Sequence, residues 1–182
     1  MSAKQNTPPK LSVILPGIRT NNWLDFYKSI ERSFEKSFEL IVISPYQLPT
    51  ELKKYDNIKH ILDYGSPSRC QQIGLVSCTG EFVTWGADDG FFLDNKLTEA
   101  YNLWQDKATS DKDIVTCKYF EGETNQQGVP HTTGRTELSK DYYYKINHAN
   151  GLRSDYIPNN YWILNVGLLK TSYAKEIGGW DT

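Results

Sequence analysis

Short apolar stretches alternate with amphipathic stretches along the first two thirds of the chain, and this alternation constrains the fold more than any other feature. Each apolar stretch is rich in β-branched or aromatic residues and ends at polar or turn residues, as is typical of buried strands. The predicted strands span residues 11–15, 38–44, 58–62, 81–85 and 113–120. Strands that alternate with helices predict an α/β fold with a mainly parallel, Rossmann-like sheet flanked by helices.

Helix signals fill the gaps between these strands. Apolar residues recur at the spacing of one helical face at Trp23, Tyr27, Ile30 and Phe34. Asn21 or Asn22 is the predicted N-cap of this first helix. The second helix has clearer boundaries, with Ser66 as the predicted N-cap, Pro67 at the first helical position and Gly80 past the end. Both helices are therefore expected to connect parallel strands.

The remaining segments have weaker patterns. Residues 49–55 predict a short helix or turn, and residues 95–106 predict a further helix. Residues 121–158 show no sustained helical period, so loops or an irregular hairpin are expected there. Residues 161–170 regain the apolar character of a strand, and Thr171 is expected to cap a short helix after it.

Length and charge exclude several classes of protein. The 182 residues suit one compact domain, and a net charge of -2 gives no basic surface for nucleic acid. No stretch has the roughly 20 apolar residues of a membrane span, and a cytoplasmic protein without a transmembrane segment is expected. The cysteines and histidines lack metal-site or disulfide spacing, so we expect free thiols and structural imidazoles. These residues are Cys70, Cys78, Cys117, His60, His131 and His148.

The stretch WGADDGFF places two adjacent carboxylates, Asp88 and Asp89, directly after the fourth predicted strand. Ligands of doubly wound sheets bind at this edge, outside the carboxyl ends of the strands. Mg²⁺ or Mn²⁺ is commonly held there by one or two carboxylates together with substrate phosphates. Gly86 and Gly90 are expected to let the backbone turn sharply around the acids. The alternative is a plain turn in which the aspartates bond the nearby backbone.

Four motifs follow one another in order along nearly the whole chain: LSVILPG, FELIVIS, SRCQQIGLVSCTGEFVTWGADD and NVGLLKTSYAKEIGGWD. In this order they resemble the family 2 glycosyltransferases, which have the GT-A fold. The resemblance implies a nucleotide-diphosphate sugar as donor and Mn²⁺ or Mg²⁺ as cofactor. It also implies a saccharide or lipid-linked acceptor.

The resemblance assigns binding roles by position. Pro16 and Gly17 would lie against the nucleotide base and ribose, and Arg69 would reach the base or the phosphates. Asp88 would face the ribose or the donor sugar, and Asp89 would coordinate the metal that bridges the diphosphate. Such a metal stabilises the charge of the departing nucleoside diphosphate.

Two arginines are candidates either for binding the donor or for ordinary surface roles. Arg19 lies just past the exit of the first strand and is a further candidate for binding the donor. Arg69 adds a charge-assisted bond if it reaches the donor, whereas on a helix surface it forms an ordinary ion pair.

The chain departs from the family pattern at three places. Ser44, Pro45 and Tyr46 stand where the family often has a base-binding Asp, so the donor nucleotide stays open. Ala87 stands where the commoner Asp-x-Asp pattern has an acid, so the chain resembles the members with adjacent acids. Inverting members carry a catalytic base just beyond the GGWD element. In this sequence Asp181 belongs to that element and Thr182 is the last residue, so a truncated enzyme or a poorly active short form is expected.

The acceptor side is predicted in the irregular second half. Trp162 and Asn165 are the candidate acceptor-binding residues, although aromatic rings here can equally pack the sheet. Trp85 lies within a predicted strand and is expected in the core. The expected organisation is a flexible segment over residues 1–10, a donor-binding half over 11–120 and an acceptor-side half over 121–182.

The sequence thus favours a metal-dependent glycosyltransferase that transfers a sugar from a nucleotide-diphosphate donor. The alternative is a non-catalytic nucleotide-sugar-binding domain or an inactive fragment. A sugar nucleotidyltransferase is disfavoured, because no glycine-rich loop with a following Arg and Lys comes after the first strand.

Overall fold

The computed structural model describes residues 7–116, 119–121, 131–133, 137–139 and 167–180. Two compact units divide the chain. The first unit contains Met1–Thr98 and Lys170–Thr182, and the second contains Glu99–Leu169. Each unit is considered by itself below.

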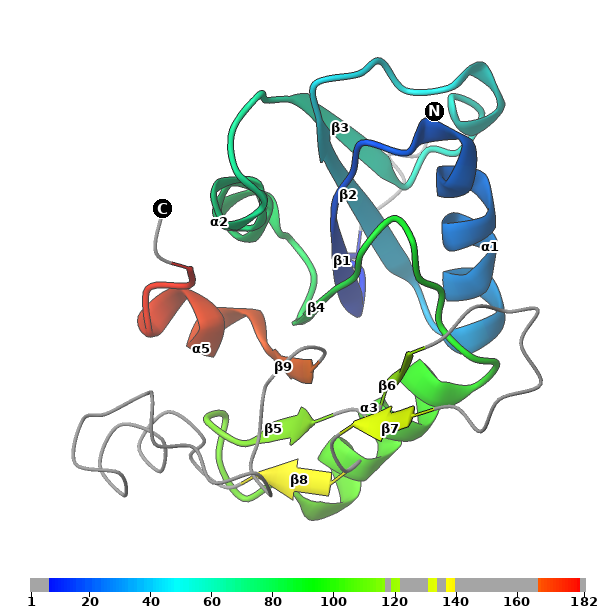
Figure 1. Cartoon of the computed structure of the whole chain (residues 1–182). Coiled ribbons are helices and arrows are strands. Elements are labelled where there is room, and N and C mark those ends of the chain that lie inside the picture. The colour runs from blue at the N-terminus through cyan, green and yellow to red at the C-terminus, as the bar shows by residue number, and fades with distance from the viewer. Residues whose placement is uncertain (1–6, 117–118, 122–130, 134–136, 140–166, 181–182) are drawn as a thin grey trace, which may run out of the picture. The chain divides into compact units, whose positions relative to one another are not determined.

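A parallel sheet forms the centre of the first unit (Figure 1). Its strands are β1 (Leu11–Pro16), β2 (Phe38–Ser44), β3 (Ile58–Leu62) and β4 (Phe82–Trp85). They are hydrogen-bonded in the order β3-β2-β1-β4, and every pairing is parallel. The carboxyl ends of all four strands therefore meet at one edge, and the loops that leave this edge are brought together.

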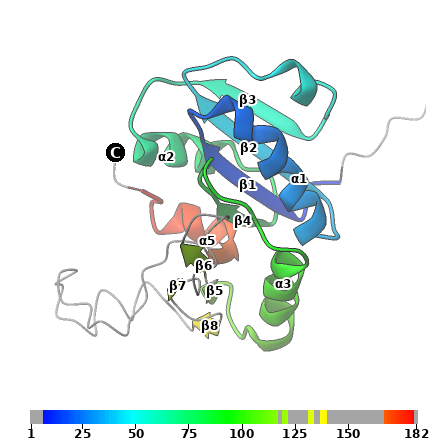
Figure 2. The ribbon, with the colours of Figure 1, turned by 45° about the vertical axis from the view of Figure 1, so that its right-hand side comes forward.

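Helices cover both faces of this sheet. On one face lies α1 (Trp23–Ser33), and on the other lies α2 (Pro67–Ser77) with α5 (Thr171–Glu176) beside it (Figures 1 and 2). Two short 3₁₀ turns, η1 (Thr20–Asn22) and η2 (Thr50–Leu52), complete the connections. The result is the doubly wound arrangement that the alternation predicts.

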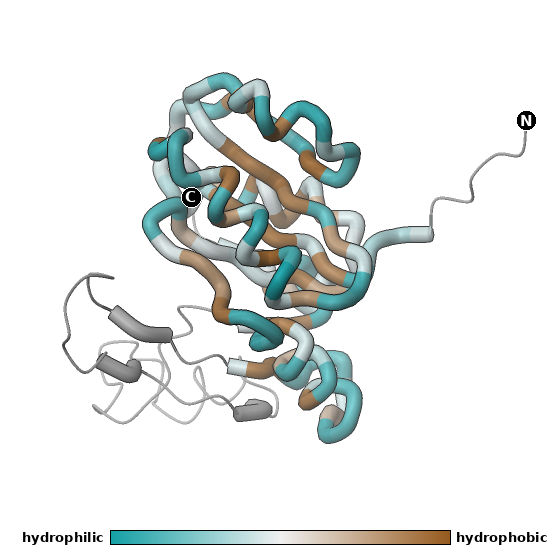
Figure 3. Tube along the Cα trace, turned by 90° about the vertical axis from the view of Figure 1, so that its right-hand side faces the viewer, coloured by the Kyte–Doolittle hydropathy of each residue, from teal (hydrophilic) through white to brown (hydrophobic). Residues whose placement is uncertain are grey.

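The core of the first unit is the sheet itself. Apolar side chains follow one another along β1 and β2, and Figure 3 shows these strands as continuous hydrophobic stretches. Strands that are covered on both faces need such uninterrupted apolar runs. Trp23 and Phe26 of α1 are 0% and 2% exposed and pack against this core. Trp85, at the end of β4, is 8% exposed, which confirms its predicted place in the core.

The second unit is antiparallel where it is described. Strand β5 (Ile114–Thr116) pairs with β8 (Glu137–Ser139) and with β9 (Gly167–Lys170), whose last residue belongs to the first unit. Strands β6 (Tyr119–Glu121) and β7 (His131–Thr133) form a separate antiparallel pair. Most of α3 (Lys96–Lys107) belongs to this unit. Loops or an irregular hairpin were expected over residues 121–158, and most of that stretch lies outside the described residues.

The predicted strands and helices up to residue 116 are confirmed, whereas the predicted strand 113–120 is described as β5 and β6 and the predicted strand 161–170 only from Gly167. One predicted cap, Thr171, is wrong. Asn22 occupies the N-cap of α1, yet its side chain makes no capping bond there. Thr171 is the first helical residue of α5, and Lys170 occupies the N-cap. Ser66 does cap α2, because its Oγ accepts a hydrogen bond from the Arg69 backbone N–H, with Pro67 next in the chain.

Candidate functional site

The acidic turn after β4 lies against the loop after β1 in the first unit. Asp88 is 4% exposed, and its Oδ2 accepts hydrogen bonds from the backbone N–H groups of Ile18 and Arg19 at 2.6 and 2.5 Å. Its Oδ1 accepts from Nη1 of Arg19 at 2.6 Å. In return, the Asn22 side-chain amide donates to the Asp88 carbonyl at 2.8 Å. The two loops are thus held together at the carboxyl edge of the sheet.

These contacts determine the charge state of Asp88. Burial by itself would raise the pKa of this carboxyl group, because a charge is costly away from water. The backbone hydrogen bonds from Arg19 and Ile18 and the guanidinium of Arg19 outweigh that effect and lower the pKa. Asp88 is therefore ionised at neutral pH, and its oxygens are already occupied by groups of this chain.

Asp89 has different surroundings. Its side chain is 59% exposed, and its Oδ2 lies 3.3 Å from Nη1 of Arg19. Within the described ranges, no group of three or more His, Cys, Asp or Glu side chains could hold a metal. A metal site here therefore fits the mode in which one protein carboxylate and the donor phosphates supply the ligands. Asp89 suits that mode because it is charged and accessible.

The glycines of this region act through close packing. Gly86 and Gly90 do not have positive φ angles, so the expected sharp turn is not the reason for glycine at either position. A Cβ added to Gly86 would lie 2.5 Å from Cζ of Phe26, whereas at Gly90 the nearest atom would be 3.6 Å away. Gly86 lets α1 and the acidic turn approach each other.

The other predicted donor residues of the first strand lie at the same edge. Pro16 is the last residue of β1 and pairs with Ile43 of β2. Gly17 donates its N–H to the Ile43 carbonyl, and a Cβ at Gly17 would lie 2.7 Å from Nε1 of Trp23. The backbone here has no room for a side chain, so the chain leaves β1 on a defined path.

Arg69 lies in a separate ion pair. Its Nη2 donates to Oδ2 of Asp63 at 2.9 Å, and its Nε lies 3.1 and 3.2 Å from the two carboxylate oxygens. The hydrogen bond from Arg69, with a smaller contribution from the Gly65 N–H, lowers the pKa of Asp63. The Asp63 backbone N–H donates to the Ser44 carbonyl, which places this pair after β3, next to the end of β2. The structure does not pair Arg69 with the acidic turn, and its side chain is 57% exposed.

Exposed apolar side chains follow the strands at this edge, and the sequence reasoning missed them. Ile18 follows β1, Tyr46 follows β2, Tyr64 follows β3 and Phe91 follows β4, with exposed fractions of 62%, 53%, 82% and 57%. Large apolar groups at one edge of a sheet suit the flat faces of bases or sugars. The signal that could have found them is their position, since each comes within a few residues of a strand end.

Several predicted residues lie outside the described residues. Trp162 and Asn165, the candidate acceptor residues, belong to this group, as does Asp181 of the GGWD element. Cys117 and His148 do as well. The other two cysteines, Cys70 and Cys78, are free and buried, as expected.

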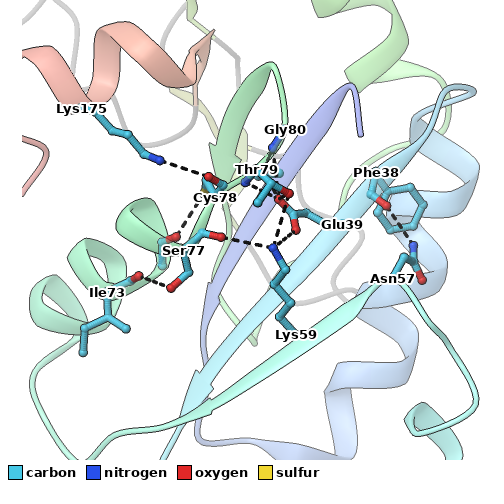
Figure 4. A network of polar contacts seen from close by, with 12 residues as sticks. Phe38, Glu39, Asn57, Lys59, Ile73, Ser77, Cys78, Thr79, Gly80 and Lys175 are labelled. Atoms are coloured by element: carbon cyan, nitrogen blue, oxygen red, sulfur yellow. Dashed lines mark hydrogen bonds and ion pairs between the residues drawn. The ribbon is translucent and has the colours of Figure 1, made fainter. Parts of the chain in front are cut away.

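A second buried acid lies at the opposite, amino edge of the same sheet (Figure 4). Oε1 of Glu39 accepts from Ser12 Oγ at 2.6 Å, from the Thr79 N–H and Oγ1 at 2.7 and 2.8 Å, and from the Gly80 N–H at 3.1 Å. Its Oε2 lies 2.6 Å from Nζ of Lys59, and its side chain is 6% exposed. This cluster ties the starts of β1, β2 and β4 together, and the residue that follows Glu39 in the chain is the buried Leu40.

Comparison with solved structures finds proteins that share this fold. The structure resembles S. aureus TarS 1-349 with a TM-score of 0.61 and 18% identity, over 95% of this chain and 50% of that one. It also resembles the mannosyltransferase PcManGT from Pyrobaculum calidifontis, solved in complex with GDP-Man and Mn²⁺. That match has a TM-score of 0.56 and 13% identity, over 97% of this chain and 48% of that one.

At these identities the likeness shows the fold: a mixed α/β arrangement with a mainly parallel sheet flanked by helices, as the sequence predicts. The chain spans about half the length of both proteins. No family model and no curated protein matches the sequence. In the parts of the chain that are described, no helix is long and apolar enough to cross a bilayer.

Proposed function

We propose that this protein is a metal-dependent glycosyltransferase of the family 2, GT-A type, which uses a nucleotide-diphosphate sugar as donor. The observation that carries the proposal is the pairing of a buried acid with an exposed one at the carboxyl edge of the sheet. Asp88 holds the loop after β1, while Asp89 presents an exposed carboxylate beside it. This occurs in a fold whose solved neighbours include a mannosyltransferase in complex with GDP-Man and Mn²⁺.

The donor would lie along the loop after β1. Pro16 and Gly17 would line the base and ribose, because the backbone there is fixed and free of side chains. By its position in the sequence, Asp88 would face the ribose or the donor sugar. Its contacts favour an indirect contribution to donor binding, because they hold Ile18 and Arg19 in place. Arg69 would reach the base or phosphates from the start of α2.

Asp89 would hold Mn²⁺ or Mg²⁺ together with the donor diphosphate. When bound, such a metal supplies Lewis-acid stabilisation of the departing nucleoside diphosphate. The contribution of Asp89 is to hold a negative charge in an accessible position, next to a loop that Asp88 keeps in place. Arg19, which contacts both acids, adds a guanidinium at the same place.

The acceptor is proposed to be a saccharide or a lipid-linked saccharide. Trp162 and Asn165 would bind it, and residues 121–182 would form the acceptor side opposite a donor side made of residues 11–120. A cytoplasmic location is part of the same proposal.

Metal-dependent nucleotide binding tests this function. UDP, GDP, CDP and dTDP sugars are titrated calorimetrically with and without Mn²⁺, and at least one is expected to bind much more tightly with the metal. Asp89→Asn should weaken that binding about tenfold or more, because an ionised metal ligand is lost. Asp94→Asn is the matched control, since Asp94 is 68% exposed and pairs with Arg32 instead.

Absence of metal-dependent binding across all four nucleotides contradicts the proposal. Turnover of the bound donor then separates a transferase from a protein that only binds nucleotide sugars. An equal loss of affinity in Asp89→Asn and Asp94→Asn would remove Asp89 from the site.

A further inference from the structure

Arg19 supplies the positive charge that both acids of the turn share. Its Nη1 lies 2.6 Å from Oδ1 of Asp88 and 3.3 Å from Oδ2 of Asp89. One guanidinium thus lies against two adjacent carboxylates and offsets part of their mutual repulsion. The side chain of Arg19 is itself 48% exposed, so it has room to change its position.

The two contacts of Arg19 differ in strength. Toward Asp88, the guanidinium bond is short, the carboxylate is 5% exposed, and the Arg19 backbone N–H reinforces the contact. Toward Asp89, there is one longer contact to a carboxylate that is 59% exposed. A long, exposed ion pair contributes little and is screened by salt, whereas a short charge-assisted bond to a buried acid is costly to break. The contact with Asp89 is therefore the exchangeable one.

Arg19 also has donor groups to spare. Its side-chain contacts with the described residues all use Nη1, whereas a guanidinium carries five N–H donors in a planar fork. This fork matches phosphate oxygens, to which arginine binds in a bidentate manner. Nε and Nη2 are thus suited to a diphosphate at this edge of the sheet.

We propose that Arg19 is the counter-ion of Asp89 in the donor-free protein, and that it yields Asp89 to the divalent cation when the donor binds. This inference rests on the proposed function. Arg19 keeps its bond to Asp88 throughout, and its free N–H groups bind the diphosphate of the incoming donor. Arg19 thus releases the carboxylate of Asp89 and binds the phosphate of the ligand in its place.

The exchange predicts two effects of opposite sign. Arg19 competes with a metal for Asp89, so removal of its charge raises the affinity for the metal alone. Arg19 cooperates with the diphosphate, so the same removal lowers the affinity for nucleoside diphosphate. A residue that only supports the shape of the loop would lower both affinities together.

The experiment measures both affinities in the 182-residue protein. Free Mn²⁺ is followed by electron paramagnetic resonance without nucleotide, and binding of the best nucleoside diphosphate is measured calorimetrically without metal. In Arg19→Gln we expect Mn²⁺ to bind about threefold tighter and the nucleotide about tenfold weaker. Arg32→Gln is the matched control, because Arg32 pairs with exposed Asp94, and it should change neither affinity.

A second variant and a wild-type measurement cover the case in which Arg19→Gln disturbs the loop. Arg19→Lys keeps the charge beside Asp88 but lacks the fork, so it should retain wild-type metal affinity and lose nucleotide affinity. In the wild type, the Nε–H resonance of Arg19 should shift when Mg²⁺ and nucleoside diphosphate are added together.

Parallel loss of both affinities in Arg19→Gln and Arg19→Lys overturns the inference, as does an Nε–H resonance that does not move. A wild-type protein that binds no nucleoside diphosphate, even with Mn²⁺, instead contradicts the proposed function. The two failures are therefore distinguishable.

Discussion

The two edges of the parallel sheet each carry a buried acid, but only the acid at the carboxyl edge, Asp88, is followed directly in the chain by an exposed one. At the amino edge, Glu39 accepts bonds from three neighbours and pairs with Lys59. At the carboxyl edge, Asp88 is held in a similar way by Ile18 and Arg19, and Asp89 stands exposed beside it. Burial and full hydrogen bonding mark both acids as supports of the fold. The additional accessible charge is what makes the carboxyl edge a candidate site.

Removal of the Glu39 carboxylate is the most severe way to test the amino edge. In Glu39→Ala, Lys59 loses its ion-pair partner, the Thr79 N–H loses its acceptor, and Ser12 Oγ keeps only the bond from the Gly80 N–H. We expect a loss of about 3–5 kcal/mol in the free energy of unfolding, measured with urea. Glu35→Ala is the control, because Glu35 is 60% exposed and pairs with Lys36. It should change the free energy of unfolding by less than about 1 kcal/mol. A small loss in Glu39→Ala would show that the cluster does not support the sheet.

Substitution of Gly86 tests the packing beneath the carboxyl edge. The added methyl group in Gly86→Ala would lie 2.5 Å from the ring of Phe26, which is 2% exposed. Overpacking of this kind should cost about 3 kcal/mol of unfolding free energy, seen as a lower thermal midpoint. Gly90→Ala meets only ordinary contact and should change stability by less than about 1 kcal/mol. Equal effects of both substitutions would argue against close packing as the role of Gly86.

Substitution of the two acids in the turn should affect different properties, stability for Asp88 and nucleotide binding for Asp89. Asp88→Asn removes the charge that Arg19 contacts at 2.6 Å and should cost about 2 kcal/mol of unfolding free energy. Asp89→Asn should change stability by less than about 0.5 kcal/mol, because the side chain is 59% exposed. Denaturation curves and nucleotide titrations on both variants make the comparison. Equal stability losses would contradict the division between a supporting and a ligand-binding acid.

Acidification should lower the free energy of unfolding through the buried acids at both edges of the sheet. Near neutral pH the effect should be small. For Glu39, burial would raise the pKa, but the bonds from Lys59, Ser12 and Thr79 outweigh it, and the pKa lies below its ordinary value of 4.5. The pKa of Asp88 likewise lies below 3.8. A lowered folded-state pKa means that the unfolded chain binds more protons, so this stability is present above the ordinary pKa and is lost as pH falls below it.

Urea denaturation between pH 7 and pH 3 measures this dependence. The wild type should lose stability mainly below pH 4.5, and Glu39→Gln should show a shallower decline than the wild type. An unchanged slope would mean that Glu39 does not titrate with folding.

The fold could be predicted from the sequence because its signals are local. Strands such as β2 have an uninterrupted apolar centre, here residues 40–43, and Ser66 with Pro67 begins α2 as the capping pattern predicts. Thr171 lies one position inside α5 rather than at its cap, and Asn22 lies at the predicted cap of α1 without bonding to that helix. The amide of Asn22 donates to the carbonyl of Asp88 rather than capping its own helix.

The site was predictable in position but not in its contacts. The strand end placed Asp88 and Asp89 at the ligand-binding edge. Their unequal exposure depends on the loop at Arg19, which is 69 residues away from Asp88 in the chain, so no local pattern could reveal it. The role of Arg69 stayed open between a surface ion pair and donor binding, because its pairing with Asp63 depends on the path of the turn between β3 and α2.

The tryptophan that precedes the acidic turn has an optical consequence. Trp85 ends β4 immediately before the turn, and its ring lies edge-on to Trp180, with centroids 5.0 Å apart and planes at 87°. Two indoles at this distance couple their electronic transitions and give a near-ultraviolet circular dichroism signal that depends on their mutual angle. The backbone N–H of Trp180 is also fixed by Gln72 of α2 at 2.9 Å, so one ring is anchored while the other borders the site. The protein therefore carries its own chromophore pair, through which a rearrangement of the turn can be followed without a label.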